Sequence, residues 1–369
     1  MKILHVAKRY PNSFGGDSVV VWQLVKHQQV AGDTVNILTT NCKDIVSVPG
    51  LRKVGLPIAS SSIDAINLKR ILTLAWLIPW SFWYLWRTCP DVIHSHTADF
   101  GFGVSLAARL YRIPIINTCH GVSFINPDHS FFKRKLEIFF LKSAGYKIIL
   151  TVDENSLSGF AKAGIRNVRF IANAVDIERF DQMAQPYTGG RLELFNVGRM
   201  ETAKGVKFLL DAVAALDKNI DWRLRLVSDG AKLEDFKAYA AELGMSDRVE
   251  FLGRVMPKKN AQYYAESHIF ILPSLHEGFP IVLLEAWAAG VPVIITKVGT
   301  ITSVCHDAVD ALLIDAGSSE QITKAIQRLA ASKALRLKLA KNGRELVKKN
   351  YTYDIVAKQI KQLYQEVIA

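Results

Sequence analysis

Short, largely apolar runs alternate along the chain with longer segments in which apolar residues recur at helical spacing. A short apolar run bounded by turn residues is typical of a strand that is buried on both faces, and strands that alternate with helices form parallel sheets. The pattern therefore predicts an α/β fold. The strands that it predicts are 3–6, 35–38, 91–96, 113–118, 148–152, 192–197, 224–227, 249–252, 269–272 and 291–295.

The length of the chain favours two domains. It has 369 residues, half of them hydrophobic, which is enough for two packed cores. A turn-rich stretch at 181–190 separates the two groups of predicted strands. We therefore predict an N-terminal domain at 1–182, a C-terminal domain at 183–349 and an amphipathic final helix within 350–369.

The segment 269–299 has the most informative pattern. An apolar run is followed by a loop, by a helix that Pro280 can begin and Gly290 can end, and by a second apolar run. Ligands of open α/β sheets bind beyond the carboxyl ends of the strands, so Glu277 is expected at a ligand-binding edge, with Glu285 on the following helix. The spacing alone leaves a second interpretation open, in which both glutamates are ordinary partners of the helix dipole.

Two glycine-containing loops also follow predicted strands. Gly15 and Gly16 lie before the first helix, where glycine lets backbone amides approach a phosphate or a sugar, although a tight turn would use them too. They do not complete a dinucleotide fingerprint, which disfavours a nicotinamide cofactor. The loop 198–205, GRMETAKG, carries Arg199 and Lys204, which can both reach a diphosphate; two solvated surface cations are the alternative.

These loops together resemble the family 4 (group 1) retaining glycosyltransferases. The residues in register with the donor-binding segment of that family are Glu277, Gly278, Phe279, Glu285, Ala286, Gly290 and Pro292. The resemblance implies the GT-B fold, in which two Rossmann-like domains face each other across a cleft and a C-terminal helix crosses back to the N-domain. It weakens after residue 295, where Thr300 and Ser303 replace the usual glycine and glutamate, and Ala308 and Ala311 replace common glycines.

The resemblance also implies roles for individual side chains. Arg199 and Lys204 would neutralise the leaving diphosphate. Glu277 would hold sugar hydroxyls, and Glu285 would accept from the nucleotide ribose. His120, at the end of a predicted strand, would contact the donor sugar or phosphate. The candidate catalytic residues are therefore His120, Arg199, Lys204 and Glu277. The candidate donor-binding residues are Gly15, Gly16, Gly198, Asp229, Gly230, Arg254, Gly278, Phe279, Pro280, Ile281 and Glu285.

The activity that the resemblance implies is retaining transfer of a sugar from a nucleoside-diphosphate sugar to a glycan or lipid-linked acceptor in cell-surface polysaccharide or glycolipid synthesis. Front-face attack would need no metal and no cofactor. Two other interpretations stay open, because a fold does not fix a reaction: a sugar-nucleotide epimerase or hydrolase, and a non-catalytic nucleotide-sugar-binding partner subunit. The pattern does not distinguish a UDP-, GDP- or ADP-sugar.

Cysteine and histidine spacing predicts no metal site. The four cysteines show no C-x-x-C spacing, which favours a reducing compartment. His94 and His96 alternate on a predicted strand, but no third ligand is near them in sequence. We expect His94 to be structural and leave the role of His96 open.

The segment 68–87 is unusual because its stretch 71–86 has no charged residue. It contains Trp76, Trp80, Trp83 and Trp86. It is either a helix buried against the N-domain sheet or an interfacial helix in contact with a membrane.

Charge is consistent with the second interpretation. The formal net charge is +12, of which +8 lies in residues 1–182, and Lys133, Arg134 and Lys135 form a basic cluster. Such charge suits an anionic substrate or an acidic membrane surface, and the absence of a nucleic-acid-binding motif disfavours nucleic acid. The expected location is cytoplasmic, with peripheral contact to the inner face of a membrane through 68–87 as an added hypothesis.

Overall fold

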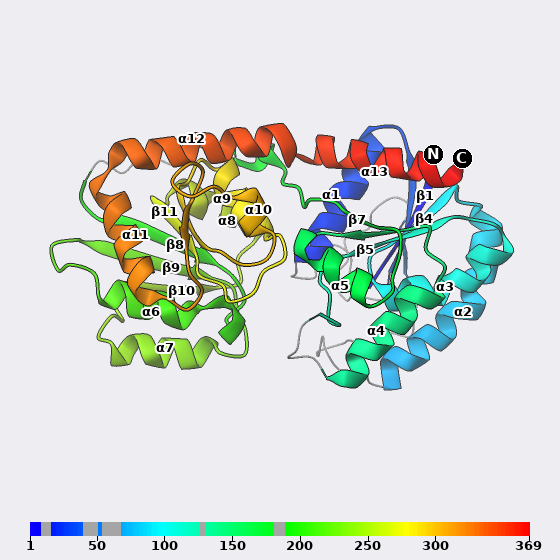
Figure 1. Cartoon of the computed structure of the whole chain (residues 1–369), viewed down its shortest axis with the longest axis horizontal. Helices are drawn as coiled ribbons and strands as arrows, with labels where there is room; N and C mark the ends of the chain where they lie inside the picture. The colour runs from blue at the N-terminus through cyan, green and yellow to red at the C-terminus, as the bar shows by residue number, and fades with distance from the viewer. Residues whose placement is uncertain (9–15, 40–50, 54–67, 126–129, 181–188) are drawn as a thin grey trace. The chain divides into compact units, whose positions relative to one another are not determined.

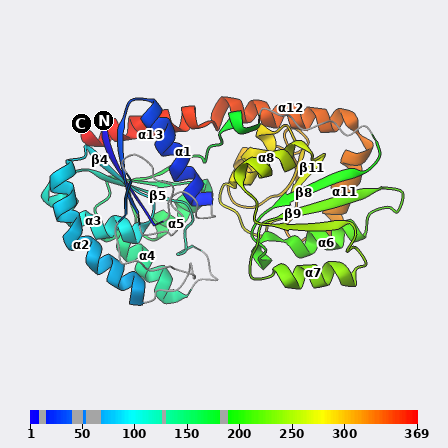
Figure 2. The same ribbon diagram turned by 180° about the vertical axis from the view of Figure 1, so that it is seen from behind.

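The computed structural model describes residues 1–8, 16–39, 51–53, 68–125, 130–180 and 189–369. The chain divides into two compact units: unit 1 is Met1–Asn173 with Tyr353–Ala369, and unit 2 is Ala174–Thr352. The domain boundary predicted at 182/183 lies outside the described residues, as does Gly15. Each unit contains one parallel sheet with helices on its faces, as Figures 1 and 2 show.

Unit 1 is built on a seven-stranded sheet in the order β3-β2-β1-β4-β5-β6-β7. The order reverses between β1 and β4, the kind of point at which α/β proteins bind ligands. Its strands are β1 (Lys2–Ala7), β2 (Thr34–Thr39), β3 (Leu51–Lys53), β4 (Val92–Ser95), β5 (Ile115–Cys119), β6 (Ile148–Thr151) and β7 (Val168–Phe170). Its helices are α1 (Gly16–Val30), α2 (Leu68–Thr88), α3 (Ala98–Leu110), α4 (Phe131–Ser143), η1 (Glu154–Ser156), α5 (Leu157–Lys162) and α13 (Tyr353–Ile368).

Unit 2 repeats this plan with six strands in the order β10-β9-β8-β11-β12-β13 and a reversal between β8 and β11. Its strands are β8 (Leu192–Val197), β9 (Trp222–Val227), β10 (Val249–Gly253), β11 (Ile269–Leu272), β12 (Val293–Thr296) and β13 (Leu312–Ile314). Its helices are η2 (Ile177–Phe180), η3 (Thr202–Lys204), α6 (Val206–Ala214), α7 (Leu233–Glu242), α8 (Pro257–Ala265), α9 (Ile281–Ala288), α10 (Ile301–Val304), α11 (Ser319–Ala331) and α12 (Lys333–Asn350).

The ten strands predicted from the apolar runs are confirmed, each to within about two residues, which is the usual uncertainty of an element boundary. The runs are apolar throughout because helices cover both faces of each sheet. In the segment 269–299, strand β11, helix α9 and strand β12 follow one another as predicted, and Gly290 has φ 71° just after α9. The pattern did not predict β3, β7 and β13.

The final helix α13 belongs to unit 1, where it packs against α1. Its buried residues Tyr353, Val356, Ile360 and Tyr364 recur every three or four positions and so form one face. The preceding helix α12 belongs to unit 2, where a Cβ on Gly343 would overlap the indole ring of Trp287 on α9. The chain thus crosses back to its N-terminal unit between these two helices, as expected for the GT-B fold (Figure 1).

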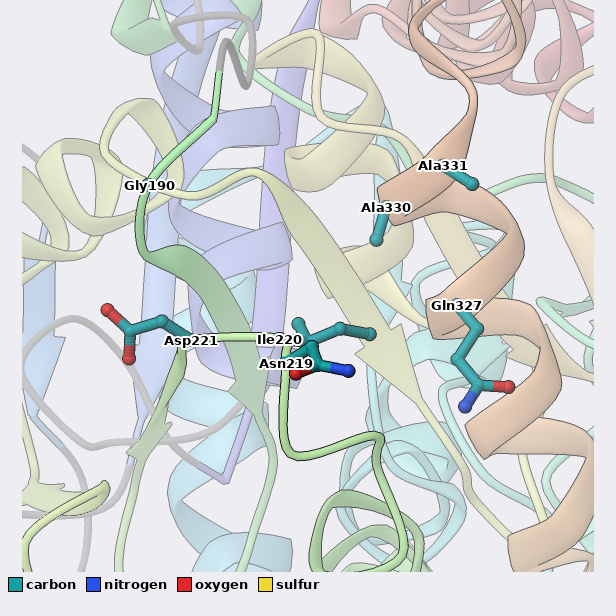
Figure 3. Close-up of a pocket in the computed structure, with 7 residues that line it drawn as sticks. All are labelled: Gly190, Asn219, Ile220, Asp221, Gln327, Ala330 and Ala331. Carbon is teal, nitrogen blue, oxygen red and sulfur yellow. The ribbon is translucent and has the colours of Figure 1, made fainter.

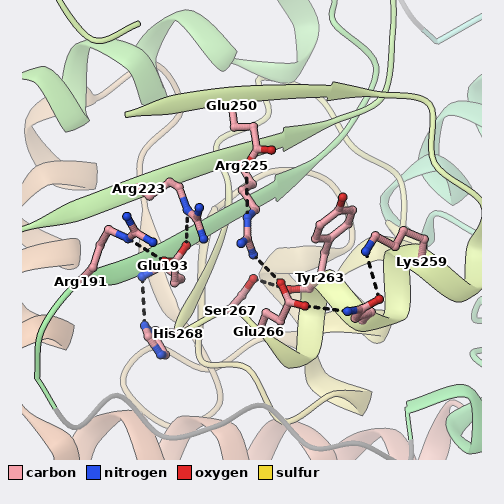
Figure 4. Close-up of polar contacts among 11 residues, drawn as sticks. Arg191, Glu193, Arg223, Arg225, Glu250, Lys259, Tyr263, Glu266, Ser267 and His268 are labelled. Atoms are coloured by element: carbon pink, nitrogen blue, oxygen red, sulfur yellow. Dashed lines mark hydrogen bonds and ion pairs between the residues drawn. The ribbon is translucent and has the colours of Figure 1, made fainter. Parts of the chain in front are cut away.

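Charged side chains replace apolar ones on part of the unit 2 sheet, as Figure 4 shows. Glu193 on β8 accepts from Arg191 at 3.0 Å and from Arg223 on β9 at 2.9 Å. Arg225, two residues along β9, donates to Glu266 at 2.8 Å. Alternate residues of a strand share a face, so Arg223 and Arg225 extend from the same face of the sheet. Because these charges are paired with each other, we interpret the network as structural.

The tryptophan-rich segment forms helix α2, which is buried on one face and exposed on another. Leu77, Tyr84 and Leu85 are buried in the core of unit 1, and Trp80 packs against the same core. The other three tryptophans are largely exposed: Trp76 at 54 %, Trp83 at 52 % and Trp86 at 65 %. Among the described helices, none combines the length and the apolar character that crossing a membrane requires.

Candidate functional site

The loops after β8 and β11 meet at the carboxyl edge of the unit 2 sheet. Gly205 has φ 66°, and a Cβ there would overlap the carbonyl oxygen of Pro273. The backbone amide of Leu275 donates to the carbonyl of Ala203 at 2.8 Å. Only glycine permits both this left-handed conformation and this close approach, so Gly205 fixes the position of the residue before it, Lys204.

Lys204 and Glu277, both predicted as catalytic, form an ion pair at this edge. The distance from Lys204 Nζ to Glu277 Oε1 is 2.6 Å, and the hydroxyl of Ser274 donates to the same oxygen at 2.7 Å. Their side chains are only 21 % and 9 % exposed. An ammonium has three donors and a carboxylate about four acceptor positions, so the pair keeps capacity to bind an anion and hydroxyl groups.

The loop after β12 closes the same edge. Gly299 has φ 55°, and a Cβ there would overlap the carbonyl oxygen of Glu277. The amide of Thr300 donates to the carbonyl of Gly278 at 3.3 Å, and Phe279 is buried against Tyr351 with ring centroids 5.1 Å apart. These contacts hold the segment Glu277–Phe279 in front of α9, with Pro280 at its N-cap and Ile281 as its first residue.

The other predicted donor-binding residues of unit 2 join the loops after β8, β9 and β10. Asp229 pairs with Arg254 at 2.5 Å, although both side chains are about half exposed. At Gly230, a Cβ would lie 2.5 Å from the carbonyl oxygen of Met200. Arg199 is 58 % exposed and pairs with Glu201 at 2.8 Å, so it is far more accessible than Lys204. A Cβ on Gly198 would rest 3.7 Å from the Lys204 side chain.

Glu285 has a different environment from that of Glu277. It is 7 % exposed, accepts from the Tyr264 hydroxyl at 3.2 Å and lies 3.9 Å from Arg179. Burial raises the pKa of Glu285 above its usual value, while Arg179 and Tyr264 oppose that shift. Sequence reasoning did not single out Arg179, Tyr264 or Ser274. Only Ser274 carried a local signal, because it lies three residues before Glu277.

In unit 1, the predicted residue His120 follows β5 and joins a buried group of histidines. Its Nε2 lies 3.1 Å from His96 Nδ1, and His96 Nε2 lies 2.9 Å from His5 Nδ1. His94 is buried beside them and bonds the Thr118 hydroxyl at 2.7 Å, as expected for a structural histidine. Gly16 is the first residue of α1.

His5 is the neighbour that the sequence did not reveal. His5, His94 and His96 could together offer ring nitrogens to a metal ion. No third ligand lies near His94 and His96 in sequence, but His5 lies near them in space, because it pairs in register with His94 on the neighbouring strand.

A hollow of about 520 Å³ in unit 2 lies at the opposite end of the sheet from these loops. Gly190 and Asp221, which precede β8 and β9, line it together with Gln327 and Ala330 of α11 (Figure 3). No predicted site residue is among its lining residues. The candidate site is therefore defined by the loops at the carboxyl edge and not by this hollow.

Comparison with known proteins identifies the family of the chain. One family model, Glycosyltransferase Family 4, matches residues 14–179, and a second, Glycosyl transferases group 1, matches residues 179–346. The chain is 27 % identical over 305 residues to a D-inositol 3-phosphate glycosyltransferase of Corynebacterium glutamicum, covering 76 % of this chain and 73 % of the relative. It is 24 % identical over 358 residues to the GDP-mannose:cellobiosyl-diphosphopolyprenol alpha-mannosyltransferase of Xanthomonas oryzae, covering 89 % and 87 %.

Solved structures show the same fold. Sucrose-phosphate synthase from Thermosynechococcus elongatus superposes with a TM-score of 0.84 at 22 % identity, covering 99 % of this chain and 98 % of that one. Anabaena HepE, solved in complex with UDP-glucose, superposes with a TM-score of 0.78 at 17 % identity, covering 99 % and 100 %. Because the two family models together span residues 14–346, the chain belongs to the group 1 glycosyltransferases of family 4 and has their GT-B fold.

Proposed function

We propose that this glycosyltransferase transfers a sugar from a nucleoside-diphosphate sugar to a lipid-linked or glycan acceptor in cell-surface polysaccharide or glycolipid synthesis, with retention of anomeric configuration. The observation that carries the proposal is the Lys204–Glu277 pair at the carboxyl edge of unit 2, held by close backbone contacts at Gly205 and Gly299. The pair places an ammonium group that can bind a phosphate beside a carboxylate that can accept hydrogen bonds from sugar hydroxyls.

Lys204 and Arg199 neutralise the diphosphate as it leaves. Charge-assisted hydrogen bonds of this kind contribute about 1.5–3 kcal/mol each. They strengthen as negative charge develops on the leaving oxygen, so they lower the barrier instead of only tightening binding. Glu277 orients the sugar through its hydroxyls, with the amides of Gly278 and Phe279 beside it. No metal or other cofactor has a role in this proposal.

Retention follows from attack on the same face of the sugar as the departing phosphate. A double displacement would instead need a carboxylate nucleophile. Glu277 Oε1 is bonded by Lys204 and Ser274, and Glu285 is buried beside Tyr264. Asp229, the third candidate carboxylate of unit 2, is paired with Arg254, so all three already have polar partners. Recording the anomeric proton of the product by NMR early in the reaction tests this step; an inverted product at the first time points would contradict it.

The nucleotide base is the next open choice. The donors named among similar proteins include GDP-mannose and UDP-glucose, which differ in both base and sugar. A thermal-shift screen against UDP-, GDP- and ADP-sugars separates them, because a ligand at one hundred times its dissociation constant stabilises a protein by about 2.7 kcal/mol. Product analysis with and without acceptor then tests transfer: release of free sugar alone, or an epimerised donor, would contradict a transferase.

A membrane-proximal acceptor is supported by exposed aromatic residues on unit 1. Helices α2, α3 and α4 lie side by side (Figures 1 and 2). Exposed on α2 are Trp76, Trp83 and Trp86, and on α4 Phe131, Phe132 and Phe139. Exposed aromatic residues beside basic ones favour the interface of a membrane, and each Lys or Arg near an anionic surface adds about 1 kcal/mol.

Sedimentation with anionic vesicles tests this contact. Wild type should pellet at low salt, and Trp83→Ser combined with Trp86→Ser should release it without loss of fold. Trp22→Ser on α1 is the matched control, because Trp22 is also exposed, at 37 %, but lies outside α2 and α4. Wild-type protein that stays in the supernatant would contradict peripheral membrane contact and leave a soluble glycan acceptor.

A further inference from the structure

A run of short hydrogen bonds crosses the buried face of the unit 1 sheet. His120 Nε2 lies 3.1 Å from His96 Nδ1, and His96 Nε2 lies 2.9 Å from His5 Nδ1. His5 Nε2 then lies 2.7 Å from the amide oxygen of Gln28 on α1. The first two ring pairs are stacked, with centroids 5.4 and 5.2 Å apart.

The run continues through the C-terminal helix. The amide nitrogen of Gln28 donates to the hydroxyl of Tyr364 on α13 at 3.2 Å. The Tyr364 hydroxyl lies 2.6 Å from His94 Nδ1, and His94 Nε2 lies 2.7 Å from the Thr118 hydroxyl. Four hydrogen bonds thus connect His120 with Tyr364 on the last helix, and two more lead on to His94 and Thr118. His5, Gln28, His94, His96 and Tyr364 are all at most 5 % exposed.

With the Gln28 amide in this orientation, the directions of the three bonds between His120 and Gln28 are determined. Its oxygen can only accept, so His5 donates from Nε2 and, as a neutral ring, accepts at Nδ1. His96 must then donate from Nε2 and accept at Nδ1, which requires His120 to donate from its own Nε2. Burial keeps the intervening rings neutral: it lowers the pKa of His5 to about 4 and that of His96 well below 6.5.

We propose that this buried hydrogen-bonded chain, running from His120 to Tyr364, fixes which ring nitrogen of His120 carries its proton. His120 is held with Nε2 protonated and with Nδ1 as the acceptor. The amide of Gln28 sets the donor-to-acceptor direction of these hydrogen bonds. The hydrogen bond to the Tyr364 hydroxyl keeps that amide from rotating by 180°. His5, His96, Gln28 and Tyr364 are therefore positioning residues, and the final helix supplies part of the setting of a site residue more than two hundred positions earlier.

The same geometry argues against a metal-binding role for the cluster of His5, His94 and His96. Two imidazole nitrogens that both bind a tetrahedral zinc at 2.0–2.1 Å lie about 3.3 Å apart. His5 Nδ1 and His96 Nε2 are 2.9 Å apart, the distance of a direct N–H···N hydrogen bond. Both nitrogens of His94 are already bonded to hydroxyl groups. A bound metal would have to break these contacts.

Histidine tautomers can be read directly in the whole protein labelled with ¹⁵N-histidine. Long-range ¹H–¹⁵N correlation at pH 7.5 should show His5, His94, His96 and His120 as neutral rings protonated at Nε2, with assignments from single His→Gln variants. A His96 ring protonated at Nδ1, or charged, would overturn the proposal. A spectrum changed by added Zn²⁺ at these rings would replace it with a metal site.

Two variants test what sets the polarity. Gln28→Met removes the amide and Tyr364→Phe removes the hydroxyl that holds it, both with little change in side-chain volume. His120 should therefore become a mixture of both tautomers in each variant. Tyr353→Phe is the matched control, because Tyr353 is a buried tyrosine on the same helix but outside the chain of bonds. If His120 keeps a single Nε2–H tautomer in Gln28→Met and Tyr364→Phe, the chain does not set it.

The role of His120 toward substrate rests on the proposed function, so activity is a separate readout. With the donor found by the thermal-shift screen, kcat of Tyr364→Phe should fall roughly 10-fold, within the range by which partners that orient a functional histidine act, while KM stays near that of Tyr353→Phe. The expected tautomers without any transferase activity would refute the proposed function and leave the tautomer assignment standing.

Discussion

Lys204 and Arg199 are both cations of the proposed diphosphate site, but their burial predicts different effects on stability. Lys204 is 21 % exposed and its partner Glu277 is 9 % exposed. In Lys204→Met the mostly buried carboxylate keeps only Ser274 as a partner. Removing one member of a fully buried ion pair costs about 3–5 kcal/mol. Because water reaches part of Lys204, we expect a loss of roughly 2–3 kcal/mol, which is a 30- to 150-fold change in a local opening equilibrium.

Arg199→Met provides the contrast within the same loop. Arg199 is 58 % exposed and its partner Glu201 is 35 % exposed, and an exposed pair contributes about 0–1 kcal/mol. Turnover, however, should fall roughly 10²–10³-fold in both variants, because each removes a donor to the leaving group. Stability and activity therefore separate in Arg199→Met and fall together in Lys204→Met.

Hydrogen exchange of the whole protein, followed by mass spectrometry on peptides from β8 and β11, measures the local free energy of opening in unit 2 alone. The double variant Lys204→Met/Glu277→Gln is the decisive control. Replacing both partners removes the unpaired charge, so protection should recover to within about 1 kcal/mol of wild type while activity stays lost. Equal protection in Lys204→Met and Arg199→Met, or no recovery in the double variant, would refute the reasoning.

Burial and backbone geometry lead to four further predictions. Burial lowers the pKa of His5 from 6.5 to about 4, so unit 1 is most stable above pH 6.5 and loses up to about 3 kcal/mol as the pH falls to 4. Burial raises the pKa of Glu137 to about 7, which acts in the opposite direction, so urea midpoints of Glu137→Gln should fall more steeply on acidification than those of wild type. Calorimetry should show that Glu285→Ala weakens binding of the bare nucleoside diphosphate, whereas Glu277→Ala weakens only the full donor; normal nucleotide binding by Glu285→Ala would make the ribose assignment wrong. Gly299→Ala should abolish donor binding, because its Cβ would overlap the Glu277 carbonyl, while Gly253→Ala, at a similar φ of 62° but in open space, should cost only the 1–3 kcal/mol of the left-handed conformation.

The strands could be predicted because each unit buries its sheet on both faces, so an apolar run is enough to mark a strand. The three strands that the pattern missed are short: β3 is LRK, β7 is VRF and β13 is LLI. All three lie at an edge of their sheet, where one side has no neighbouring strand. An edge strand of three residues carries too little apolar periodicity to stand out from a loop, and β3 and β7 also have an arginine at their centre.

The unit 2 residues of the candidate site were predictable for a local reason. Lys204 and Glu277 each follow a strand of one sheet, and parallel strands that follow one another through right-handed crossovers bring their carboxyl ends to one edge. This topology rule and the family resemblance are together enough to place Lys204 and Glu277 beside each other. The contacts of Glu285 are different, because Arg179 and Tyr264 come from η2 and α8 and have no spacing that points to it.

The histidine chain lay beyond sequence reasoning because its order in space is unrelated to its order in the chain. Its bonds join residues up to 336 positions apart, and its polarity depends on one side-chain amide. A periodicity or a short motif reports only neighbours within a few residues. The sequence does place His5 and His94 on apolar strands. A histidine buried in such a strand must be neutral and must have its polar atoms hydrogen-bonded.

The tryptophan-rich helix shows why composition alone could not decide between the two interpretations of this segment. At 3.6 residues per turn, Leu72, Trp76 and Trp83 share one face of α2, and these three are exposed. Leu77 and Tyr84 lie about a third of a turn away, on the face that packs into unit 1. The number of tryptophans could not distinguish a core helix from an interfacial one. The helical period places Trp80 against the core and Trp76 and Trp83 on the exposed face. Serine at Trp80, which stacks on Tyr84 with centroids 4.6 Å apart, should therefore destabilise unit 1, whereas serine at Trp83 should leave its stability unchanged and act only on vesicle binding.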